Sequence, residues 1–220
     1  MKPFFISGIG TGIGKTLIAA VLTEALRADY WKPVQAGLDQ RTDSSWLASM
    51  VSNRESVVHP ETYKLKLAAS PHIAARKENI QIDLNRIVDD FKKMDPSRPL
   101  IIEGAGGLMV PLNESEFVAD LVKQLDARLI LVSRNYLGSI NHSLMTATCC
   151  RSYGLDVAGW VFNDQYMDYE QEIVAWSGYP ALFSLPLLKM ITKQTISETA
   201  GRIELPFRQT VTGASGHQGE

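Results

Sequence analysis

Cysteine is scarce in this sequence: Cys149 and Cys150 are the two present, and they are adjacent. An adjacent pair matches neither a disulfide framework nor the ligand spacing of a zinc site. We therefore expect both to be small, buried apolar side chains on one helix, in a protein of the reducing cytoplasm. His59, His72 and His142 also lack a ligand-like spacing and are interpreted as structural residues.

An excess of positive charge is also lacking. The chain has 22 lysine and arginine residues against 24 aspartate and glutamate residues, a net charge of -2. Binding to nucleic acid or to an anionic membrane requires a basic face, which this composition does not favour. No apolar run is long enough to cross a membrane, and no charged and then apolar leader precedes the strand-like residues 4–6. We expect no nucleic-acid or membrane partner, so any phosphate ligand must be bound locally.

Short apolar runs alternate with amphipathic stretches along the chain. This alternation is typical of βα units, and it predicts an α/β fold with a mostly parallel sheet flanked by helices on both faces. The length of 220 residues favours one domain, which we place at residues 1–209. Residues 210–220 are expected to form a mobile tail, because they can bury little apolar surface.

The predicted strands lie at residues 3–7, 30–34, 99–103, 128–133, 157–163 and 181–186. Apolar residues recur with helical spacing within residues 17–25, 84–91 and 118–125, which predicts amphipathic helices packed on the sheet. Residues 39–79 are less regular, with Pro60 and Pro71 as breakers and short helical segments near residues 44–51 and 71–76. We expect this irregular segment to lie over the ligand-binding edge of the sheet.

The strongest local pattern is the segment GIGTGIGKT at residues 8–16, between a predicted strand and a predicted helix. Its glycines let several backbone N–H groups face one anion, and the start of the following helix adds the positive end of its dipole. Lys15 supplies a mobile cation, and the Thr16 hydroxyl can bind Mg²⁺. The segment predicts a phosphate-binding loop of the P-loop NTPase class. A glycine-rich turn without a ligand is the alternative.

This phosphate loop is a variant. The strict P-loop pattern requires glycine at position 9, where the chain has Ile9. The dinucleotide-binding pattern requires glycine at position 13, where the chain has Ile13, and no acidic residue follows at the spacing that a ribose requires. The pattern therefore favours a P-loop over a dinucleotide-binding fold.

Two acidic residues could bind the metal ion that accompanies a nucleotide. Glu103 ends the apolar run at residues 100–102, so its carboxylate would lie at the carboxyl edge of a strand, where open α/β sheets bind ligands. A carboxylate that faces solvent is the alternative. Asp43 follows the second predicted strand, where it could equally be the N-cap of a helix that begins at Ser44.

Three other polar residues lie at the ends of predicted strands. Lys32 stands among aromatic and proline residues, where a buried ammonium group requires an anionic partner unless it extends to solvent. Asn163 and Asp164 follow the strand predicted at residues 157–163. An amide at this position can offer both a donor and an acceptor to a purine ring.

Six motifs in this order resemble the dethiobiotin synthetase family. They are GIGTGIGKT at residues 8–16, KPVxxG at 32–37, SPH at 70–72, EGAGG at 103–107, LGxINH at 137–142 and GWVxND at 159–164. Six motifs in register are far more specific than the phosphate loop, which alone indicates only a P-loop nucleoside triphosphatase.

The resemblance implies an ATP-dependent cyclo-ligase of biotin synthesis, in which 7,8-diaminopelargonate, CO₂ and ATP give dethiobiotin, ADP and phosphate. One amine takes up CO₂ to form a carbamate, a carbamate oxygen attacks the γ-phosphate, and the second amine closes the ring by displacing phosphate from the carbamic-phosphate. Because the carbamate and the triphosphate are both anionic, positioning and charge neutralisation would be the main tasks of the protein. Mg²⁺ as cofactor and a homodimer with its active site near the interface are implied as well.

The resemblance also implies a role for each matching residue. The implied catalytic residues are Lys15 and Lys32, with Lys32 between the carbamate and the γ-phosphate. The implied Mg²⁺ ligands are Thr16, Asp43 and Glu103. The diamine would contact Thr11, Lys32, Ala36, Gly106 and, near a helix start across the dimer interface, Asn141. ATP would contact Gly12, Ile13, Gly14, Lys15, Thr16, Leu17, Asp43, Glu103, Gly106, Asn163, Asp164, Pro186 and Leu187, with Asn163 and Pro186 at the adenine.

The chain departs from the family pattern at several positions. Ala36 stands where members often have a hydroxyl residue, so one substrate hydrogen bond is lost or comes from the backbone. Gly12 stands where some members have an acidic residue. The match fades beyond Pro186, which leaves the nucleotide preference open.

Two alternative functions remain at this stage. A regulatory ATPase of the partitioning or metal-insertion type would be controlled by a protein partner, but such proteins often have a second lysine early in the loop, where this chain has Gly10. An amidoligase-type synthetase that acts on a larger carboxylate would differ in its substrate rather than in its loop.

Overall fold

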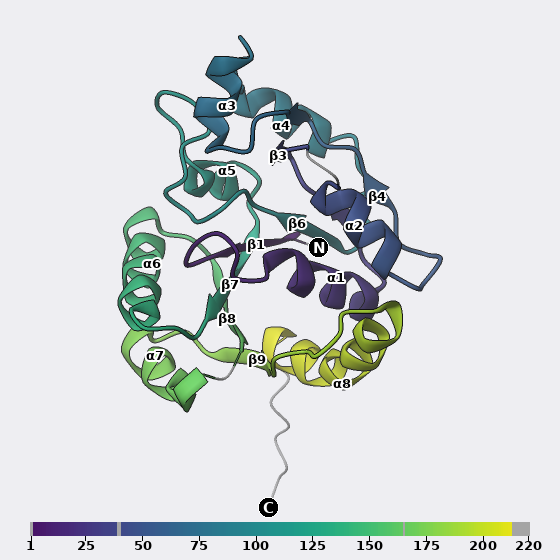
Figure 1. Ribbon diagram of the computed structural model, residues 1–220, viewed down its shortest axis with the longest axis vertical. Coiled ribbons are helices and arrows are strands. Elements are labelled where there is room, and N and C mark those ends of the chain that lie inside the picture. Colours follow the sequence, from purple (N-terminus) through teal and green to yellow (C-terminus); the bar gives the residue numbers. More distant parts are fainter. Residues whose placement is uncertain (1, 39–40, 165, 213–220) are drawn as a thin grey trace, which may run out of the picture.

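A parallel β-sheet lies at the centre of the computed structural model, which describes residues 2–38, 41–164 and 166–212, without the side chains of 166 and 209–212 (Figure 1). The seven strands of this sheet, within the described residues, follow the order β4-β2-β6-β1-β7-β8-β9. All of their pairings are parallel. The bounds are β1 Phe4–Gly8, β2 Asp29–Trp31, β4 Val58–His59, β6 Leu100–Glu103, β7 Arg128–Arg134, β8 Val157–Asn163 and β9 Ala181–Leu185.

Helices cover both faces of this sheet (Figure 1). The core on one face includes residues of α1 (Lys15–Leu26), α2 (Asp43–Met50) and α8 (Lys193–Thr212). The core on the opposite face includes residues of α3 (Pro71–Lys77), α4 (Leu84–Phe91), α5 (Val118–Gln124), α6 (Ser139–Tyr153) and α7 (Glu170–Ser177). A 3₁₀ helix, η1, spans Tyr166–Asp168, and two short strands, β3 (Val34–Ala36) and β5 (Tyr63–Leu65), form a separate parallel pair.

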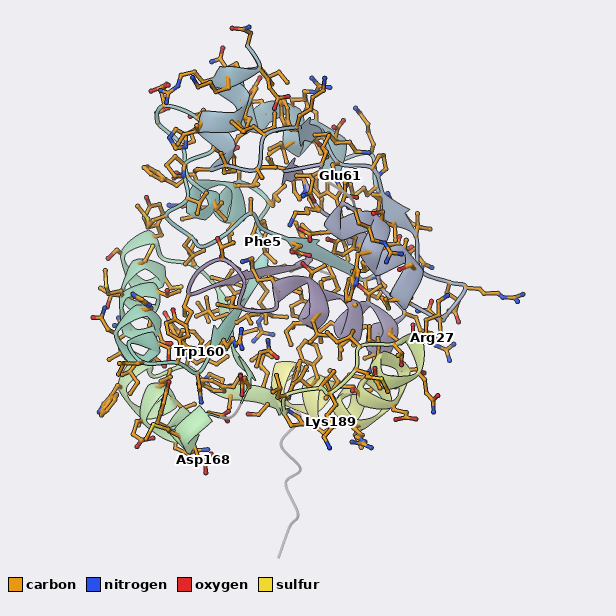
Figure 2. All side chains as sticks on the ribbon, in the orientation of Figure 1. Phe5, Arg27, Glu61, Trp160, Asp168 and Lys189 are labelled. Atoms are coloured by element: carbon orange, nitrogen blue, oxygen red, sulfur yellow. The ribbon has the colours of Figure 1, made fainter. Side chains whose placement is uncertain are left out.

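The central strands are apolar on both sides because both sides are covered. In β1, Phe4 and Ile6 belong to the core that includes α1, and Phe5 belongs to the opposite core. Figure 2 shows Phe5 and Trp160 in the interior, and both are fully buried. This two-sided burial explains why the strands have continuous apolar runs rather than alternating polar residues. The predicted fold class, a single α/β domain with a mostly parallel sheet, is confirmed.

Five of the predicted strands correspond to β1, β6, β7, β8 and β9. The strand predicted at residues 30–34 is wrong as a single element, because β2 ends at Trp31 and β3 begins at Val34 in a different sheet. Pro33 has no N–H group to continue the ladder, so the chain leaves the central sheet at Lys32. The prediction also missed β4 and β5, which are only two and three residues long.

The predicted helices are α1, α4 and α5, and the short helical segments in residues 39–79 are α2 and α3. Cys149 and Cys150 are unpaired on α6, and burial raises the pKa of Cys150 to about 12. The backbone of α8 continues to Thr212, and residues 213–220 of the predicted tail lie outside the described residues. Among the described helices, none is long and apolar enough to span a membrane.

Candidate active site

A cleft of about 710 Å³ opens beside the carboxyl ends of β1, β2 and β6. Parallel strands all deliver their following residues to the same edge of a sheet, so segments far apart in the sequence meet there. Residues 68–71, from the segment predicted to lie over this edge, form another part of the wall. The cleft brings together ten of the predicted site residues: Thr11, Gly12, Gly14, Lys15, Thr16, Lys32, Ala36, Asp43, Glu103 and Gly106.

The glycine-rich loop between β1 and α1 requires glycine at Gly14. This residue has φ 96°, in the left-handed region, and a Cβ there would lie 2.1 Å from Asn163 Nδ2. Gly14 is also the N-cap of α1 and has no side chain to bond the first turn of the helix. The N–H groups of that turn therefore remain available for an anion.

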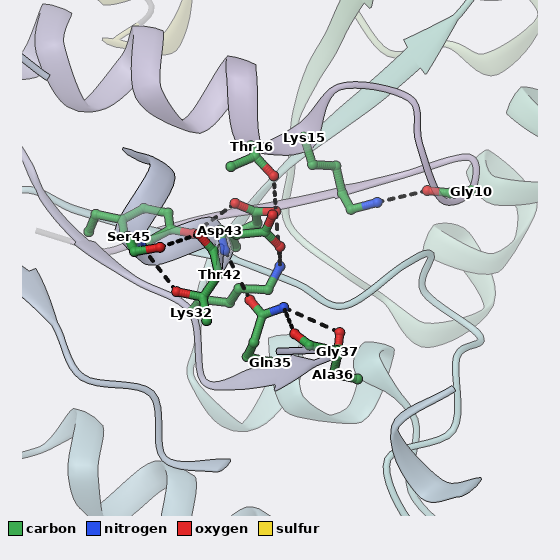
Figure 3. A network of polar contacts seen from close by, with 12 residues as sticks. Gly10, Lys15, Thr16, Lys32, Gln35, Ala36, Gly37, Thr42, Asp43 and Ser45 are labelled. Atoms are coloured by element: carbon green, nitrogen blue, oxygen red, sulfur yellow. Dashed lines mark hydrogen bonds and ion pairs between the residues drawn. The ribbon is translucent and has the colours of Figure 1, made fainter. Parts of the chain in front are cut away.

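Lys15 is buried within this loop, and its Nζ donates a hydrogen bond to the backbone oxygen of Gly10 at 2.7 Å (Figure 3). Burial, with a smaller contribution from the charge of Lys32, lowers the pKa of Lys15 to about 8, although the charges of Glu103 and Asp43 oppose this shift. The ammonium group is thus costly to keep charged without an anionic ligand.

Glu103, the last residue of β6, is the centre of the polar network. It is 1% exposed. Its Oε1 accepts hydrogen bonds from Thr16 Oγ1 at 2.8 Å and from Lys32 Nζ at 3.0 Å, and its Oε2 accepts one from the Tyr30 hydroxyl at 2.8 Å. The alternative of a carboxylate that faces solvent is therefore wrong, because three donors converge on it inside the protein.

Lys32 lies between two carboxylates (Figure 3). Its Nζ is 2.7 Å from Asp43 Oδ2 and 3.0 Å from Glu103 Oε1, and the residue is 4% exposed. Burial alone would lower the pKa of Lys32, but the charges and hydrogen bonds of Glu103 and Asp43 outweigh it and raise the pKa above its ordinary value. The alternative of a lysine that extends to solvent is wrong, and the side chain is held as an ammonium group.

Asp43 is the first residue of α2 rather than its N-cap. The N-cap is Thr42, whose Oγ1 accepts a hydrogen bond from the N–H group of Ser45 at 3.1 Å. The N-cap alternative for Asp43 is therefore wrong, and its carboxylate is directed to Lys32 instead.

Thr16, Asp43 and Glu103 fit a magnesium ion by the chemistry of their donor atoms. They offer one hydroxyl and two carboxylates, and Mg²⁺ binds oxygen ligands and usually keeps water or substrate phosphate oxygens as the others. Within the part of the chain that the structure describes, no group of three or more His, Cys, Asp or Glu residues could hold a metal ion without such additional ligands.

Thr11 and Gly106 are neighbours in the wall of the cleft. Gly106 has φ 70°, and a Cβ there would lie 3.5 Å from Thr11 Oγ1. Ala36, Ala68, Ala69 and Val110 also line the cleft and make part of its wall apolar. An apolar wall suits the hydrocarbon chain of a small organic substrate.

Several predicted residues lie outside the cleft lining. Ile13 is buried in the core, and its carbonyl accepts a hydrogen bond from Asn163 Nδ2 at 2.8 Å. Leu17 packs against the same core. Asn163 lies opposite Leu185 in the pairing of β8 with β9. It is therefore near Pro186, at the carboxyl ends of these two strands.

The remaining predicted residues are more exposed to solvent. Asp164 Oδ2 lies 3.4 Å from Arg134 Nη2, and Leu187 is 71% exposed. Asn141 is an exposed residue in the first turn of α6, where its Nδ2 is 3.4 Å from Met145 Sδ. The cleft of a single chain does not include these residues.

Tyr30 and Gln35 belong to the site although the sequence patterns did not indicate them. Tyr30 is two residues before Lys32, and residues two apart in extended backbone point to the same side. That spacing could have indicated that the Tyr30 hydroxyl meets the partner of Lys32, which is Glu103. Gln35 lines the cleft and bonds to both ends of the segment between β3 and α2.

The fold and this loop define a P-loop nucleoside triphosphatase. Solved structures that share the fold include the MinC:MinD cell division complex of Aquifex aeolicus (TM-score 0.59, 13% identity, 100% of this chain and 99% of that one) and a ParA family ATPase of Chlorobium tepidum (TM-score 0.57, 15% identity, 97% and 99%). The AAA domain family model matches residues 2–195.

Sequence similarity then defines the family within this class. The chain is 47% identical over 205 residues to the ATP-dependent dethiobiotin synthetase of Cytophaga hutchinsonii, covering 92% of this chain and 97% of that protein. It is 42% identical over 196 residues to the one of Agrobacterium fabrum, covering 89% and 91%. The chain belongs to the family of ATP-dependent dethiobiotin synthetases.

Proposed function

We propose that this chain is a cytoplasmic enzyme that converts 7,8-diaminopelargonate, CO₂ and ATP to dethiobiotin, ADP and phosphate. The observation that carries the proposal is the position of Lys32 in the same cleft as the phosphate loop. There its buried ammonium group lies 2.7 Å from Asp43 and 3.0 Å from Glu103. Membership in the synthetase family supports it over a regulatory ATPase, whose likeness to this chain is one of fold.

The phosphate loop would bind ATP. The N–H groups at the start of α1 and the Lys15 ammonium would hold the β- and γ-phosphates, for which Lys15 must exchange its hydrogen bond with Gly10 for phosphate oxygens. Asn163 and Pro186 would contact the adenine. This placement would orient the γ-phosphate toward the Lys32 side of the cleft.

Lys32 would act on the reacting groups. A carbamate, formed by addition of one substrate amine to CO₂, attacks the γ-phosphorus; the new O–P bond forms as the bond to ADP breaks. The second amine then attacks the carbamate carbon, and phosphate leaves as the ring C–N bond forms. The Lys32 ammonium, preorganised by two carboxylates, would neutralise the charge on the transferring phosphoryl group.

Thr16, Asp43 and Glu103 would hold Mg²⁺, which supplies charge neutralisation at the phosphates when bound. Thr16 and Glu103 are already oriented by their mutual hydrogen bond of 2.8 Å. Thr11, Ala36 and Gly106 would position the diamine along the apolar part of the cleft wall.

A homodimer would complete the substrate site. Asn141 lies outside the cleft of its own chain, and two apolar side chains near it, Leu137 and Met145, are 97% and 63% exposed. Burying these side chains against a second copy would favour association and place Asn141 of one protomer beside the cleft of its partner.

The test of the function is release of ADP from Mg-ATP with and without 7,8-diaminopelargonate and CO₂, with mass detection of the cyclic urea. ADP release that requires both co-substrates and yields dethiobiotin supports the synthetase. Release that is independent of the diamine, or no release, would contradict it and direct the search to a protein partner or to another amine or carboxylate.

Substituting Glu103→Gln is expected to raise the Mg²⁺ concentration for half-maximal activity by about tenfold, because a neutral amide is a poorer ligand for a hard cation. Mg²⁺ titration at saturating ATP measures it, and Mg²⁺-dependent ADP binding by calorimetry gives a second readout. The control is Glu61→Gln, a carboxylate that is 3% exposed, paired with Lys64 and outside the cleft lining. Identical titrations for wild type and Glu103→Gln would assign Glu103 a purely structural role.

A further inference from the structure

We propose that Gln35 is a positioning residue that links the metal-binding carboxylate of Asp43 to the substrate-binding turn at Ala36 and Gly37. The inference rests on the proposed function for what the two ends of this link bind. The hydrogen bonds that form the link are independent of it.

The side-chain amide of Gln35 is bonded on both of its polar atoms (Figure 3). Its Nε2 donates to the backbone oxygens of Ala36 at 3.2 Å and Gly37 at 3.0 Å, and its Oε1 accepts from the N–H group of Asp43 at 3.2 Å. The residue is 6% exposed and lines the cleft. One planar group therefore holds both ends of the segment between β3 and α2.

The bond to Asp43 fulfils a requirement of α2. The first N–H groups of a helix have no partner within the helix. Thr42 Oγ1 accepts the N–H group of Ser45, and Gln35 Oε1 accepts that of Asp43. Gln35 thus fixes the position of the Asp43 backbone, from which the carboxylate reaches Lys32 at 2.7 Å.

The bonds to Ala36 and Gly37 fix the other end of the segment. Gly37 has φ 86° and donates its N–H group to the backbone oxygen of Leu65 at 2.9 Å, so the turn is attached to β5 on one side and to Gln35 on the other. Because Ala36 has no hydroxyl group, this turn can offer the substrate only its backbone and a methyl group. Its position then depends on these backbone contacts, and displacement of the turn would change the diamine site.

Two substitutions of Gln35 test the two ends of the link separately. Gln35→Met has a side chain of similar length and makes none of the three hydrogen bonds. Gln35→Glu keeps an acceptor for the Asp43 N–H group but has no N–H group for Ala36 and Gly37, and its carboxylate faces their carbonyl oxygens. The matched control is Gln124→Met, an exposed glutamine whose side-chain amide donates a hydrogen bond to Glu116 and which lies outside the cleft lining.

For Gln35→Met we expect the KM for the diamine and the Mg²⁺ concentration for half-maximal activity each to rise about tenfold, with kcat reduced less than threefold. Gln35→Glu is expected to raise the diamine KM by a similar factor and to leave the Mg²⁺ requirement within threefold of wild type. Gln124→Met is expected to match wild type in both. If Gln35→Met leaves both quantities within twofold at a temperature where it is folded, Gln35 does not position either group.

Calorimetry of Mg²⁺-dependent ADP binding, without diamine, keeps this test separate from the proposed function. Weaker Mg²⁺-dependent binding in Gln35→Met but not in Gln35→Glu supports the link to Asp43 even if the wild type makes no dethiobiotin. Equal binding in wild type and both variants would overturn that half of the proposal, whatever the reaction is.

Discussion

Replacing Lys32 by methionine is expected to lower the rate of dethiobiotin formation by about 10²- to 10³-fold at saturating substrates, the range seen when one preorganised charge or donor is removed from a transition state. Lys32 is the ammonium group between Asp43 and Glu103, and its raised pKa keeps it charged throughout the physiological range. Without it, the transferring phosphoryl group would meet two carboxylates and no neutralising side chain at this position. Single-turnover measurements with preformed enzyme·Mg-ATP complex isolate the chemical step.

The same substitution is expected to destabilise the nucleotide-free protein by about 2–4 kcal/mol, because it leaves a buried carboxylate without its cation. Glu103 keeps its hydrogen bonds from Thr16 and Tyr30, and the Asp43 side chain is 37% exposed, so the loss stays within the range of a single broken ion pair. Added Mg²⁺ should recover part of the loss, since a divalent cation can replace the missing positive charge. Urea unfolding with and without Mg²⁺ measures both effects.

Lys32→Arg tests whether a positive charge at this position is sufficient for turnover, and Lys92→Ala is the control. Arginine restores a cation but not the compact ammonium group, so we expect Lys32→Arg to recover stability more than turnover. Lys92 pairs with Asp89 on the surface, and its removal should change neither quantity. Near-normal turnover in Lys32→Met at a temperature where the variant is folded would remove Lys32 from the mechanism.

The parts of this site that the sequence predicted are those whose position follows from the fold class. A βα unit with a glycine-rich turn must place Lys15 and Thr16 at the start of a helix, and a buried parallel strand must deliver Glu103 to its carboxyl edge. These inferences need only the order of the strands and helices. They do not need the contacts of individual side chains.

The parts that the sequence did not predict depend on which side chains meet across the edge. The Pro33 break sends Gln35 into a separate two-stranded sheet, so its contacts with Asp43 could not be derived from a continuous strand at residues 30–34. Tyr30 looked like one more apolar residue of a buried strand, although its hydroxyl group bonds to Glu103. The role of Asp43, as a metal ligand or as the N-cap of α2, likewise could not be decided without knowing that the helix starts one residue earlier and is capped by Thr42.

Replacing Lys15 by methionine is expected to abolish measurable turnover and to weaken ATP binding by about 10²-fold, since charge-assisted hydrogen bonds to phosphate contribute about 1.5–3 kcal/mol each. The same change should stabilise the empty protein at pH 7 by about 1–3 kcal/mol. The reason is that burial lowers the pKa of Lys15 to about 8 from 10.5, so folding buries a charge at a net cost. Calorimetry with ATP and urea unfolding of the nucleotide-free protein measure the two effects.

The contribution of Lys15 to the free energy of unfolding depends on pH. Below pH 8 both the folded and the unfolded chain hold the Lys15 proton, and the cost of burying the charge is at its full value. Between pH 8 and 10.5 the unfolded chain binds more protons than the folded one, so the contribution of Lys15 to the free energy of unfolding becomes more favourable as pH rises. The advantage of Lys15→Met over wild type should therefore be largest at pH 7 and disappear toward pH 10.5.

Nucleotide binding should show the complementary pH dependence. Bound phosphates favour the ammonium form, so binding above pH 8 requires the empty site to take up a proton, and the affinity of wild type for ATP should fall by up to tenfold per pH unit. Lys15→Met should lack this dependence, and Lys92→Ala should retain it. Two results would contradict this account. If Lys15→Met is less stable than wild type at pH 7, the buried Lys15 ammonium group does not destabilise the empty protein. If Lys15→Met binds ATP with the pH dependence of wild type, the protonation of Lys15 does not cause that dependence.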